Sequence, residues 1–319
     1  MIKYLTQRLL IAIPSLLGIS IVVFTLLALA PGDPFSELAT NPNVPPEVQT
    51  MLRAKFGLDD PVPVRYLHWL TAMLQGDWGF SFANRINVST LILQRLPATL
   101  LVLGLSQVLA LIIAIPVGVG AAIKPYSVFD QIASTLAFIG FSLPTFFTGL
   151  VFILVFSIQL HWLPFIFRTD LDVTGWRWYW EEFRQSIMPI AVLGLYQGAS
   201  WTRYVRSAVL DVISLDYVTT ARAKGLCERA VITKHVLRTA LIPIVTLVAL
   251  QMPAIFGGAI VTEQIFRVPG IGSLLINAIL ANDTPVIMSV TFVFACLVVF
   301  FNLIADLLYG WLDPRVSYR

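Results

Sequence analysis

The polar stretch 203–238 is where the sequence gathers residues that could make specific contacts. It holds seven basic side chains against three acidic ones: Arg203, Arg206, Arg222, Lys224, Arg229, Lys234 and Arg238 against Asp211, Asp216 and Glu228. A cationic segment of this kind either meets the anionic headgroups of a membrane or presents a surface to another protein. The stretch is therefore a candidate contact surface.

A short helix is predicted inside this stretch, over 215–224. Ser214 or Asp216 is a suitable N-cap, and Lys224 lies in the last turn, where the helix dipole favours a cation. Gly225 fits the left-handed position that ends a helix, because it has no Cβ to clash there.

Small side chains at Ala221 and Ala223 set this helix apart from an ordinary solvated loop. A short helix on a cytoplasmic loop is usually a connector on the membrane surface, whereas small side chains let another protein approach closely. Both interpretations stay open at this point. A second helical stretch, 228–239, leads into the next apolar run and carries apolar residues on one side.

Polar side chains inside the apolar runs form a second candidate group. They could line a path for a polar solute, or they could hydrogen-bond between helices, which is worth about 0.6 kcal/mol on average. Ser134 and Thr145 belong to this group, and the candidates for a pore lining are Gln107, Ser142, Gln197, Ser200, Gln251 and Asn302. Both roles stay open.

Catalytic chemistry finds no support in the sequence. No Gly-x-x-x-x-Gly-Lys-Ser/Thr run occurs, so this chain is not expected to bind or hydrolyse ATP. Neither Gly-x-Ser-x-Gly nor His-Glu-x-x-His occurs, and His68, His161 and His235 belong to three different connections or span ends, which disfavours an intramembrane enzyme. Cys227 and Cys296 form neither a disulfide framework nor a metal quartet. We therefore expect no catalytic residue, cofactor or metal on this chain.

A self-powered secondary transporter is the other alternative. Carriers of that class normally place ionisable residues near the bilayer centre to couple ions, and the apolar runs hold none. The nearest acid, Asp306, lies close to the inner end of the last run, one turn after Asn302. We expect it to pair with a basic residue or to cap a backbone group, although an intramembrane acid is a functional candidate by default.

The elements that must position these residues follow from composition. Hydrophobic residues make up 57% of the 319 positions and charged residues 12%, whereas ordinary globular domains carry about 25% charged residues. Lipid must therefore be part of the solvent, which excludes a cytosolic enzyme. The net charge of +3 is too small to indicate binding to nucleic acid.

Six stretches free of Asp, Glu, Lys and Arg can cross a bilayer: 9–32, 96–123, 131–167, 185–202, 239–262 and 284–305. A helix needs about 20 apolar residues to bridge about 30 Å of hydrocarbon, and the shortest run, with 18, is within range. A lone strand would leave its backbone unsatisfied in lipid, so all six are predicted as helices. The expected fold class is all-α, a polytopic membrane protein with six transmembrane helices.

Orientation follows from the placement of Lys and Arg. With a cytoplasmic N-terminus, twelve of them fall in inner segments and four in the short outer loops, among them Arg267 between the last two runs. Basic residues in short loops stay on the cytoplasmic side, so both chain ends are expected there. The chain then divides into a tail and first span (1–32), an external loop region with short helices (33–95) and a five-helix core (96–319) with the cytoplasmic loop 203–238.

The external region 33–95 carries two short amphipathic patterns. The residues at helical spacing in the first pattern are Val48, Met51, Leu52 and Phe56. Those in the second are Tyr66, Leu67, Leu70, Met73 and Leu74. The pattern then breaks at 76–79, which reads Gly-Asp-Trp-Gly. The region is either a small cap packed on the helix ends or a docking surface for an external partner.

Several separate motifs occur together and in order along nearly the whole chain. They are Gly76-Asp77, the run from Arg95 to Leu100, the run from Asp216 to Leu226, Glu263-Gln264-Ile265-Phe266, Pro269-Gly270-Ile271-Gly272, Asp283-Thr284-Pro285-Val286, Asn302 with Asp306, and the closing stretch from Leu307 to Arg315. With these motifs the chain resembles the inner-membrane permease subunits of ATP-binding-cassette importers. The resemblance is to the branch that takes up dipeptides, oligopeptides, nickel and glutathione.

The resemblance implies a type I importer permease fold and a set of partners. They are a homologous permease subunit, expected to form a heterodimer with this chain, two ATP-binding subunits that hold the ATP and Mg, an extracytoplasmic substrate-binding protein near 33–95, and the bilayer of the bacterial inner membrane. The chain itself would be a transport subunit without catalytic activity or a bound cofactor.

In that family a cytoplasmic loop between two late spans forms the coupling helix, which sits in a cleft of the ATPase subunit. The resemblance assigns this role to Asp216, Tyr217, Thr220, Ala221, Ala223, Lys224, Gly225 and Leu226. The general pattern of the family is Glu-Ala-Ala, three residues, then Gly. Only Ala221 and Gly225 match it, and Thr219 and Thr220 replace its first two residues, as in the peptide and nickel branch.

Overall fold

The computed structural model describes residues 2–29, 60–168, 170 and 174–312. In these ranges the chain is helical, and the only β pairing among them is an isolated bridge between Phe80 and Asn87. The helices are α1 (Ile2–Leu29), α4 (Val62–Leu74), α5 (Val88–Ile123), α6 (Val128–Ser142), α7 (Thr145–Phe152), the π-helix η1 (Ile153–Gln159) and α8 (Trp176–Ile213). They continue with α9 (Asp216–Ala223), α10 (Glu228–Ala230), the π-helix η2 (Val231–Val236), α11 (Leu237–Phe266), α12 (Ile271–Leu280) and α13 (Thr284–Leu312). The predicted all-α class is confirmed.

Several described helices are long and apolar enough to cross a membrane. Four do so alone: Leu10–Leu29, Val88–Ile123, Glu228–Val248 and Thr284–Ile304. Two bent pairs raise the number to six if each counts as one span: Val128–Ser142 with Thr145–Gln159, and Ala259–Phe266 with Ile271–Leu280. In the first pair, α6 and the following helix are bent by 100°.

Two of the predicted segments differ from the structure. The run 185–202 is helical within α8, but α8 is not among the helices that meet this criterion of length and apolarity. Much of α8 is buried in the protein, including the polar Gln185 and Ser186, so its surface need not be uniformly apolar. The connection after 262, predicted as an outer loop, contains the apolar helix α12.

The chain divides into two compact units, residues 1–97 with 273–299 and residues 98–272 with 300–319. In the first unit, α4 packs on α1 through an aromatic group formed by Phe24, Tyr66 and Trp69, and the Ser20 and Tyr66 hydroxyl oxygens lie 2.9 Å apart. The second predicted amphipathic pattern is thus confirmed as α4. The first, at 48–56, lies outside the described residues.

The segment after α4 packs on the beginning of α13 within the same unit. Gly76 and Gly79 have positive φ, as expected of the break predicted there. The Ser81 hydroxyl donates to a carboxylate oxygen of the buried Asp283 at 2.6 Å, and the Ala83 amide donates to the same oxygen at 3.2 Å. Hydrogen bonds between residues about 200 positions apart therefore hold the segment after α4 in place.

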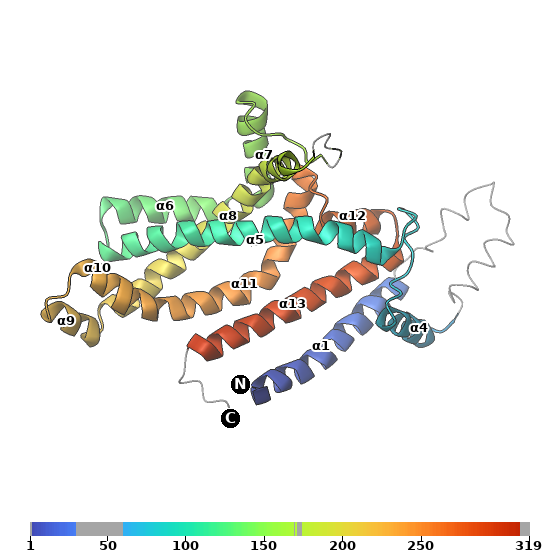
Figure 1. The fold of residues 1–319 in the computed structure, drawn as a ribbon, viewed down its shortest axis with the longest axis horizontal. Coiled ribbons are helices and arrows are strands. Elements are labelled where there is room, and N and C mark those ends of the chain that lie inside the picture. The colour runs from blue at the N-terminus through green and yellow to red at the C-terminus, as the bar shows by residue number, and fades with distance from the viewer. Residues whose placement is uncertain (1, 30–59, 169, 171–173, 313–319) are drawn as a thin grey trace. The chain divides into compact units, whose positions relative to one another are not determined.

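In the second unit, α6, α7 and α11 all pack against α8 (Figure 1). The helices α9 and α10 lie at the end of α8 that carries Ile213, and α7 lies toward its other end. A buried cluster of apolar side chains from α5, α8, α9, η2 and α11 fills the space between these helices. This unit carries the residues singled out at 203–238 and most of the polar candidates in the apolar runs.

Candidate functional site

The helix predicted over 215–224 is confirmed as α9, Asp216–Ala223. Its N-cap is Leu215, in an extended conformation and without a side-chain cap, so the prediction of Ser214 or Asp216 as N-cap was wrong. Ser214 is in the right-handed helical region at the end of α8, and Asp216 already lies in the first turn of α9. The Asp216 carboxylate therefore stabilises α9 through the helix dipole and does not cap the helix.

The C-terminus of α9 is a Schellman motif. Gly225 has φ +77°, its amide donates to the Arg222 carbonyl at 2.9 Å, and the Leu226 amide donates to the Ala221 carbonyl at 3.4 Å. A Cβ on Gly225 would meet no atom within 4 Å, so the backbone conformation alone calls for glycine. The predicted left-handed position is confirmed.

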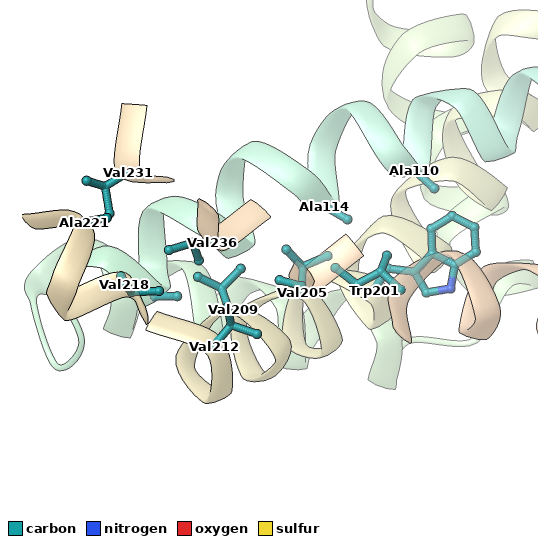
Figure 2. Close-up of a cluster of buried hydrophobic side chains, with 13 residues drawn as sticks. Ala110, Ala114, Trp201, Val205, Val209, Val212, Val218, Ala221, Val231 and Val236 are labelled. Carbon is teal, nitrogen blue, oxygen red and sulfur yellow. The ribbon is translucent and has the colours of Figure 1, made fainter. Parts of the chain in front are cut away.

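One face of α9 packs into the protein core (Figure 2). Val218 and Ala221 are buried beside Val212 of α8 and beside Val231 and Val236 of η2. The small side chain of Ala221 therefore serves internal packing, while Ala223 is exposed. The spacing of the two buried positions, i and i+3, is that of a single helix face.

Two polar contacts join α9 to the segment that follows it. The Tyr217 hydroxyl donates to the Thr239 hydroxyl at 3.0 Å, and it lies 3.3 Å from the His235 carbonyl. The Arg222 guanidinium makes two hydrogen bonds to the Glu228 carboxylate, at 2.7 and 3.2 Å, and this pairing raises the pKa of Arg222. The α9 helix is thus fixed at both ends.

The remaining face of α9 is open to solvent. Among the residues assigned to this helix by the sequence, the exposed ones are Asp216, Tyr217, Thr220, Ala223, Lys224, Gly225 and Leu226. Tyr217 and Leu226 on this face are each about two fifths exposed. An anchored helix with such a face is suited to protein contact.

A cavity of about 650 Å³ lies where α6, α7, α8 and α11 meet. Its lining brings together four of the six candidate pore residues, Ser142, Gln197, Ser200 and Gln251. The remaining lining consists of Phe141, Leu143, Pro144, Thr145, Phe146, Leu193, Tyr196 and Val261. No residue of this lining carries a formal charge, so the cavity offers amides, hydroxyls and aromatic faces to a solute.

Two of these lining residues also make the interhelical hydrogen bond that was the alternative. The Gln197 side-chain amide donates to the Gln251 side-chain oxygen at 2.8 Å, and the Trp201 indole donates to the same oxygen at 2.7 Å. The predicted interhelical hydrogen bond is therefore confirmed for this pair, which joins α8 to α11 within the cavity wall, and the pore-lining role stays a prediction. Ser134, in contrast, donates to Asp130.

The other two candidates lie elsewhere. Gln107 is buried in α5, where its amide lies 3.4 Å from the Ser106 hydroxyl. Asn302 is half-buried in α13. Neither residue is part of the lining of this cavity.

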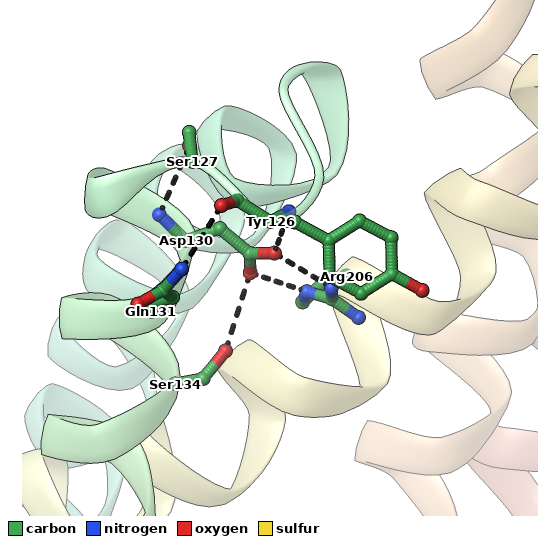
Figure 3. A network of polar contacts seen from close by, with 6 residues as sticks. All are labelled: Tyr126, Ser127, Asp130, Gln131, Ser134 and Arg206. Atoms are coloured by element: carbon green, nitrogen blue, oxygen red, sulfur yellow. Dashed lines mark hydrogen bonds and ion pairs between the residues drawn. The ribbon is translucent and has the colours of Figure 1, made fainter.

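Two acids in the second unit are buried, which was not predicted: Glu263 was noted only as part of a motif, and Asp130 was not singled out. Asp130 in α6 pairs with Arg206 in α8 (Figure 3). Glu263 in α11 accepts a 2.6 Å hydrogen bond from the Thr99 hydroxyl, which in turn accepts one from the Ile271 amide at 2.9 Å. A Cβ on Gly270 would collide with the Glu263 carboxylate, so the motif around 269–272 is glycine-rich to enclose this acid.

Comparisons with known proteins identify the family. The model of binding-protein-dependent transport system inner membrane components matches residues 114–318, and the amino-terminal model of such membrane components matches residues 1–103. The chain is 43% identical to the oligopeptide transport system permease protein AppB of Bacillus subtilis, over the whole length of both chains. It is 36% identical to the dipeptide transport system permease protein DppB of Escherichia coli and to the glutathione transport system permease protein GsiC of Salmonella choleraesuis, again over the whole of each chain.

These matches cover both compact units and agree with the apolar helices described above. The chain is therefore a membrane-embedded protein that belongs to the binding-protein-dependent transport system inner membrane components.

Proposed function

We propose that this chain is one of two homologous permease subunits that together form the translocation path of an ATP-binding-cassette importer. The observation that carries the proposal is the anchored helix α9, which buries Val218 and Ala221 and leaves its opposite face open. A helix that must transmit force to the rest of the chain needs this combination of a fixed base and a free surface. The relatives named as permeases of peptide and glutathione transport systems support the same function.

In this proposal α9 is the coupling helix that docks into an ATP-binding subunit. Asp216, Thr220, Ala223, Lys224 and Leu226 would contact the partner, since they are exposed. Tyr217, Ala221 and Gly225 would keep the helix in place, through the hydrogen bond to Thr239, the core contact and the left-handed turn. Two ATP-binding subunits would hold ATP and Mg, and this chain would bind no cofactor and catalyse no reaction.

The uncharged cavity beside Ser142, Gln197, Ser200 and Gln251 would be this subunit's share of the translocation path. Its amide and hydroxyl groups can exchange hydrogen bonds with a peptide backbone, and its aromatic residues can contact varied side chains. We propose peptides as the substrate class, with glutathione as a chemically related peptide. A self-powered carrier normally needs an acid, a histidine or an amine along such a path, and the described cavity lining holds no Asp, Glu, His, Lys or Arg.

The remaining partners follow from the same proposal. An extracytoplasmic binding protein would deliver the solute near 33–95, and the second permease subunit would close the path from the other side as a heterodimer. The chain would lie in the bacterial inner membrane with both ends in the cytoplasm. The excess of Lys and Arg in the segments assigned to the inner side supports this orientation.

The docking of α9 can be tested with one bulky substitution. Ala223→Trp enlarges an exposed side chain on the open face of α9 and leaves Val218 and Ala221 in the core. We expect the variant to insert normally, to retain its partner permease and to lose most of its ATP-binding subunit in co-purification. Thr233→Trp, at an exposed position of η2, is the matched control and should co-purify like the wild type. Equal recovery of the ATP-binding subunit with both variants would refute the assignment.

A further inference from the structure

The N-terminal end of α6 is joined to α8 by an ion pair between the buried Asp130 and the partly exposed Arg206 (Figure 3). The Arg206 Nε and one terminal nitrogen lie 2.6 and 2.7 Å from the two carboxylate oxygens of Asp130. The Asp130 side chain is only 4% exposed, and that of Arg206 is 26% exposed. We call this pair, together with the residues that hydrogen-bond to Asp130, the α6 clamp.

Every accessible lone pair of the Asp130 carboxylate is engaged in the α6 clamp. The Tyr126 amide donates to one oxygen at 2.8 Å, and the Ser134 hydroxyl donates to the other at 3.2 Å. The Ser127 hydroxyl caps α6 by accepting from the Asp130 amide at 3.3 Å. The clamp therefore fixes the orientation of the first turn of α6 and the turn before it.

The pair buries the Asp130 carboxylate and leaves Arg206 partly exposed, so its main cost is the desolvation of the acid. Well-packed apolar side chains of similar volume avoid the desolvation of a buried charge and are often as stabilising or more so. What a bidentate pair adds is a fixed geometry between the two elements.

The opposite end of α6 forms part of the cavity wall. Phe141 and Ser142 line the cavity, and so do residues 143–146, where the chain bends by 100° between α6 and α7. The Arg203 guanidinium lies 4.1 Å above the ring centre of Phe141, one helical turn before Arg206. The short helix α6 thus runs from the clamp to the cavity, and α8 contacts it near both ends.

The helix α8 also connects the clamp to α9. Val205, Val209 and Val212 of α8 belong to the same buried cluster as Val218 and Ala221 of α9. Two residues separate the end of α8 from the beginning of α9. The segment of α8 that carries Arg206 is therefore connected to α9 through packed side chains.

We propose that the α6 clamp transmits the movement of α9 to the cavity: Asp130 and Arg206 are positioning residues that make α6 follow α8 when the cytoplasmic side is displaced. The bend at 143–146 would allow α6 to tilt while α7 keeps its place. This inference rests on the proposed function, since it needs an ATP-binding subunit that moves α9.

A purely stabilising role would have a different signature. Loss of the pair would then lower the amount of assembled complex, and the complex that did assemble would import as much solute per ATP as the wild type. The pair between Glu181 and Arg184 at the other end of α8 provides a comparison, with its closest atoms 3.7 Å apart. Glu181→Gln breaks an ion pair on the same helix at a distance from α6.

The test uses the complete complex in vesicles, with the binding protein and a dipeptide as solute, and compares Arg206→Lys with Glu181→Gln. Lysine keeps the positive charge but cannot make the two parallel hydrogen bonds of arginine. We expect Arg206→Lys to assemble and hydrolyse ATP, while the solute imported per ATP falls roughly tenfold, within the usual range of coupling between two sites. Glu181→Gln should keep the wild-type ratio.

A second readout follows the cavity directly. Ser142→Cys is introduced in a chain whose Cys227 and Cys296 are replaced by serine, and its rate of reaction with a thiol reagent is measured with and without ATP. In the unmodified clamp we expect ATP to change this rate, and with Arg206→Lys we expect the ATP effect to disappear. If Arg206→Lys does not assemble, Asp130→Glu, which keeps the charge and displaces the carboxylate, takes its place.

The outcomes separate the two proposals. The role of the α6 clamp would be overturned if an assembled clamp variant imported as much solute per ATP as the wild type and kept the wild-type ATP effect at position 142. In that case, ATP-driven uptake by the wild type would still support the proposed function. A wild-type complex that imported no solute with ATP would instead overturn the proposed function. A reduced ratio in Glu181→Gln of the same size as in the clamp variant would also count against the clamp.

Discussion

Replacement of Gly225 by alanine tests whether the left-handed turn after α9 has the role that the structure gives it. Gly225 has φ +77°, and an added Cβ meets no atom within 4 Å, so only the backbone energy changes. The left-handed conformation costs a residue with a Cβ about 1–2 kcal/mol. Alanine recovers about 0.4–1 kcal/mol of this through the lower entropy of the unfolded chain. The net cost is therefore about 1 kcal/mol, or roughly a fivefold shift in the local opening equilibrium.

Hydrogen exchange of the reconstituted chain measures this shift. The amides of Lys224, Gly225 and Leu226 all donate within the turn, so their protection should fall about fivefold in Gly225→Ala. Gly225→Asn is the matched variant, because asparagine tolerates the left-handed region, and it should lose less protection. Equal loss in both variants, or none in Gly225→Ala, would mean that backbone strain at this position does not determine the stability of the turn.

Three further predictions concern other parts of the chain. Gly270→Ala places a Cβ against the Glu263 carboxylate and should destabilise the chain by about 1–3 kcal/mol, seen as a lower melting temperature in detergent; an unchanged melting temperature would contradict the packing described. An impermeant thiol reagent should label the exposed Cys227 only when the cytoplasmic face is accessible and should leave the half-buried Cys296 unlabelled, and labelling of Cys227 in intact cells would reverse the orientation. Gln251→Leu removes the shared acceptor in the cavity wall and should reduce uptake with little change in ATP-binding subunit recovery, whereas wild-type uptake would exclude this amide from the path.

The sequence predicted local features of the site well. The end of α9 at Gly225 depends on the chemistry of one residue, and α4 and α9 follow from helical spacing over about ten residues. The prediction that treated the two alanines of α9 alike was wrong. Ala221 lies one turn after Val218 on the buried face, and Ala223 does not, so the spacing itself held the information.

Features that depend on distant partners were not predictable in the same way. Asp130 accepts hydrogen bonds from Arg206, 76 positions later, and Glu263 accepts one from Thr99, 164 positions earlier. No local pattern therefore identifies either acid as buried. The cavity is a similar case. Gln197 and Gln251 could be recognised as polar residues in apolar runs, but only the crossing of α8 and α11 and the bend after Ser142 bring them together.

The regular spacing of buried residues along α8 gives a continuous packed connection between its two ends. Trp201, Val205 and Val209 are fully buried and follow one another at intervals of four residues, so they form one stripe on the helix. Trp201 at the beginning of this stripe donates to Gln251 in the cavity wall, and the end of the stripe packs with Val218 of α9. Close-packed interiors transmit displacement because their side chains cannot slide freely past one another. Under the proposed function, a partner that contacts only α9 would therefore act on the cavity through these packed side chains, without a solute or a charge passing between the two places.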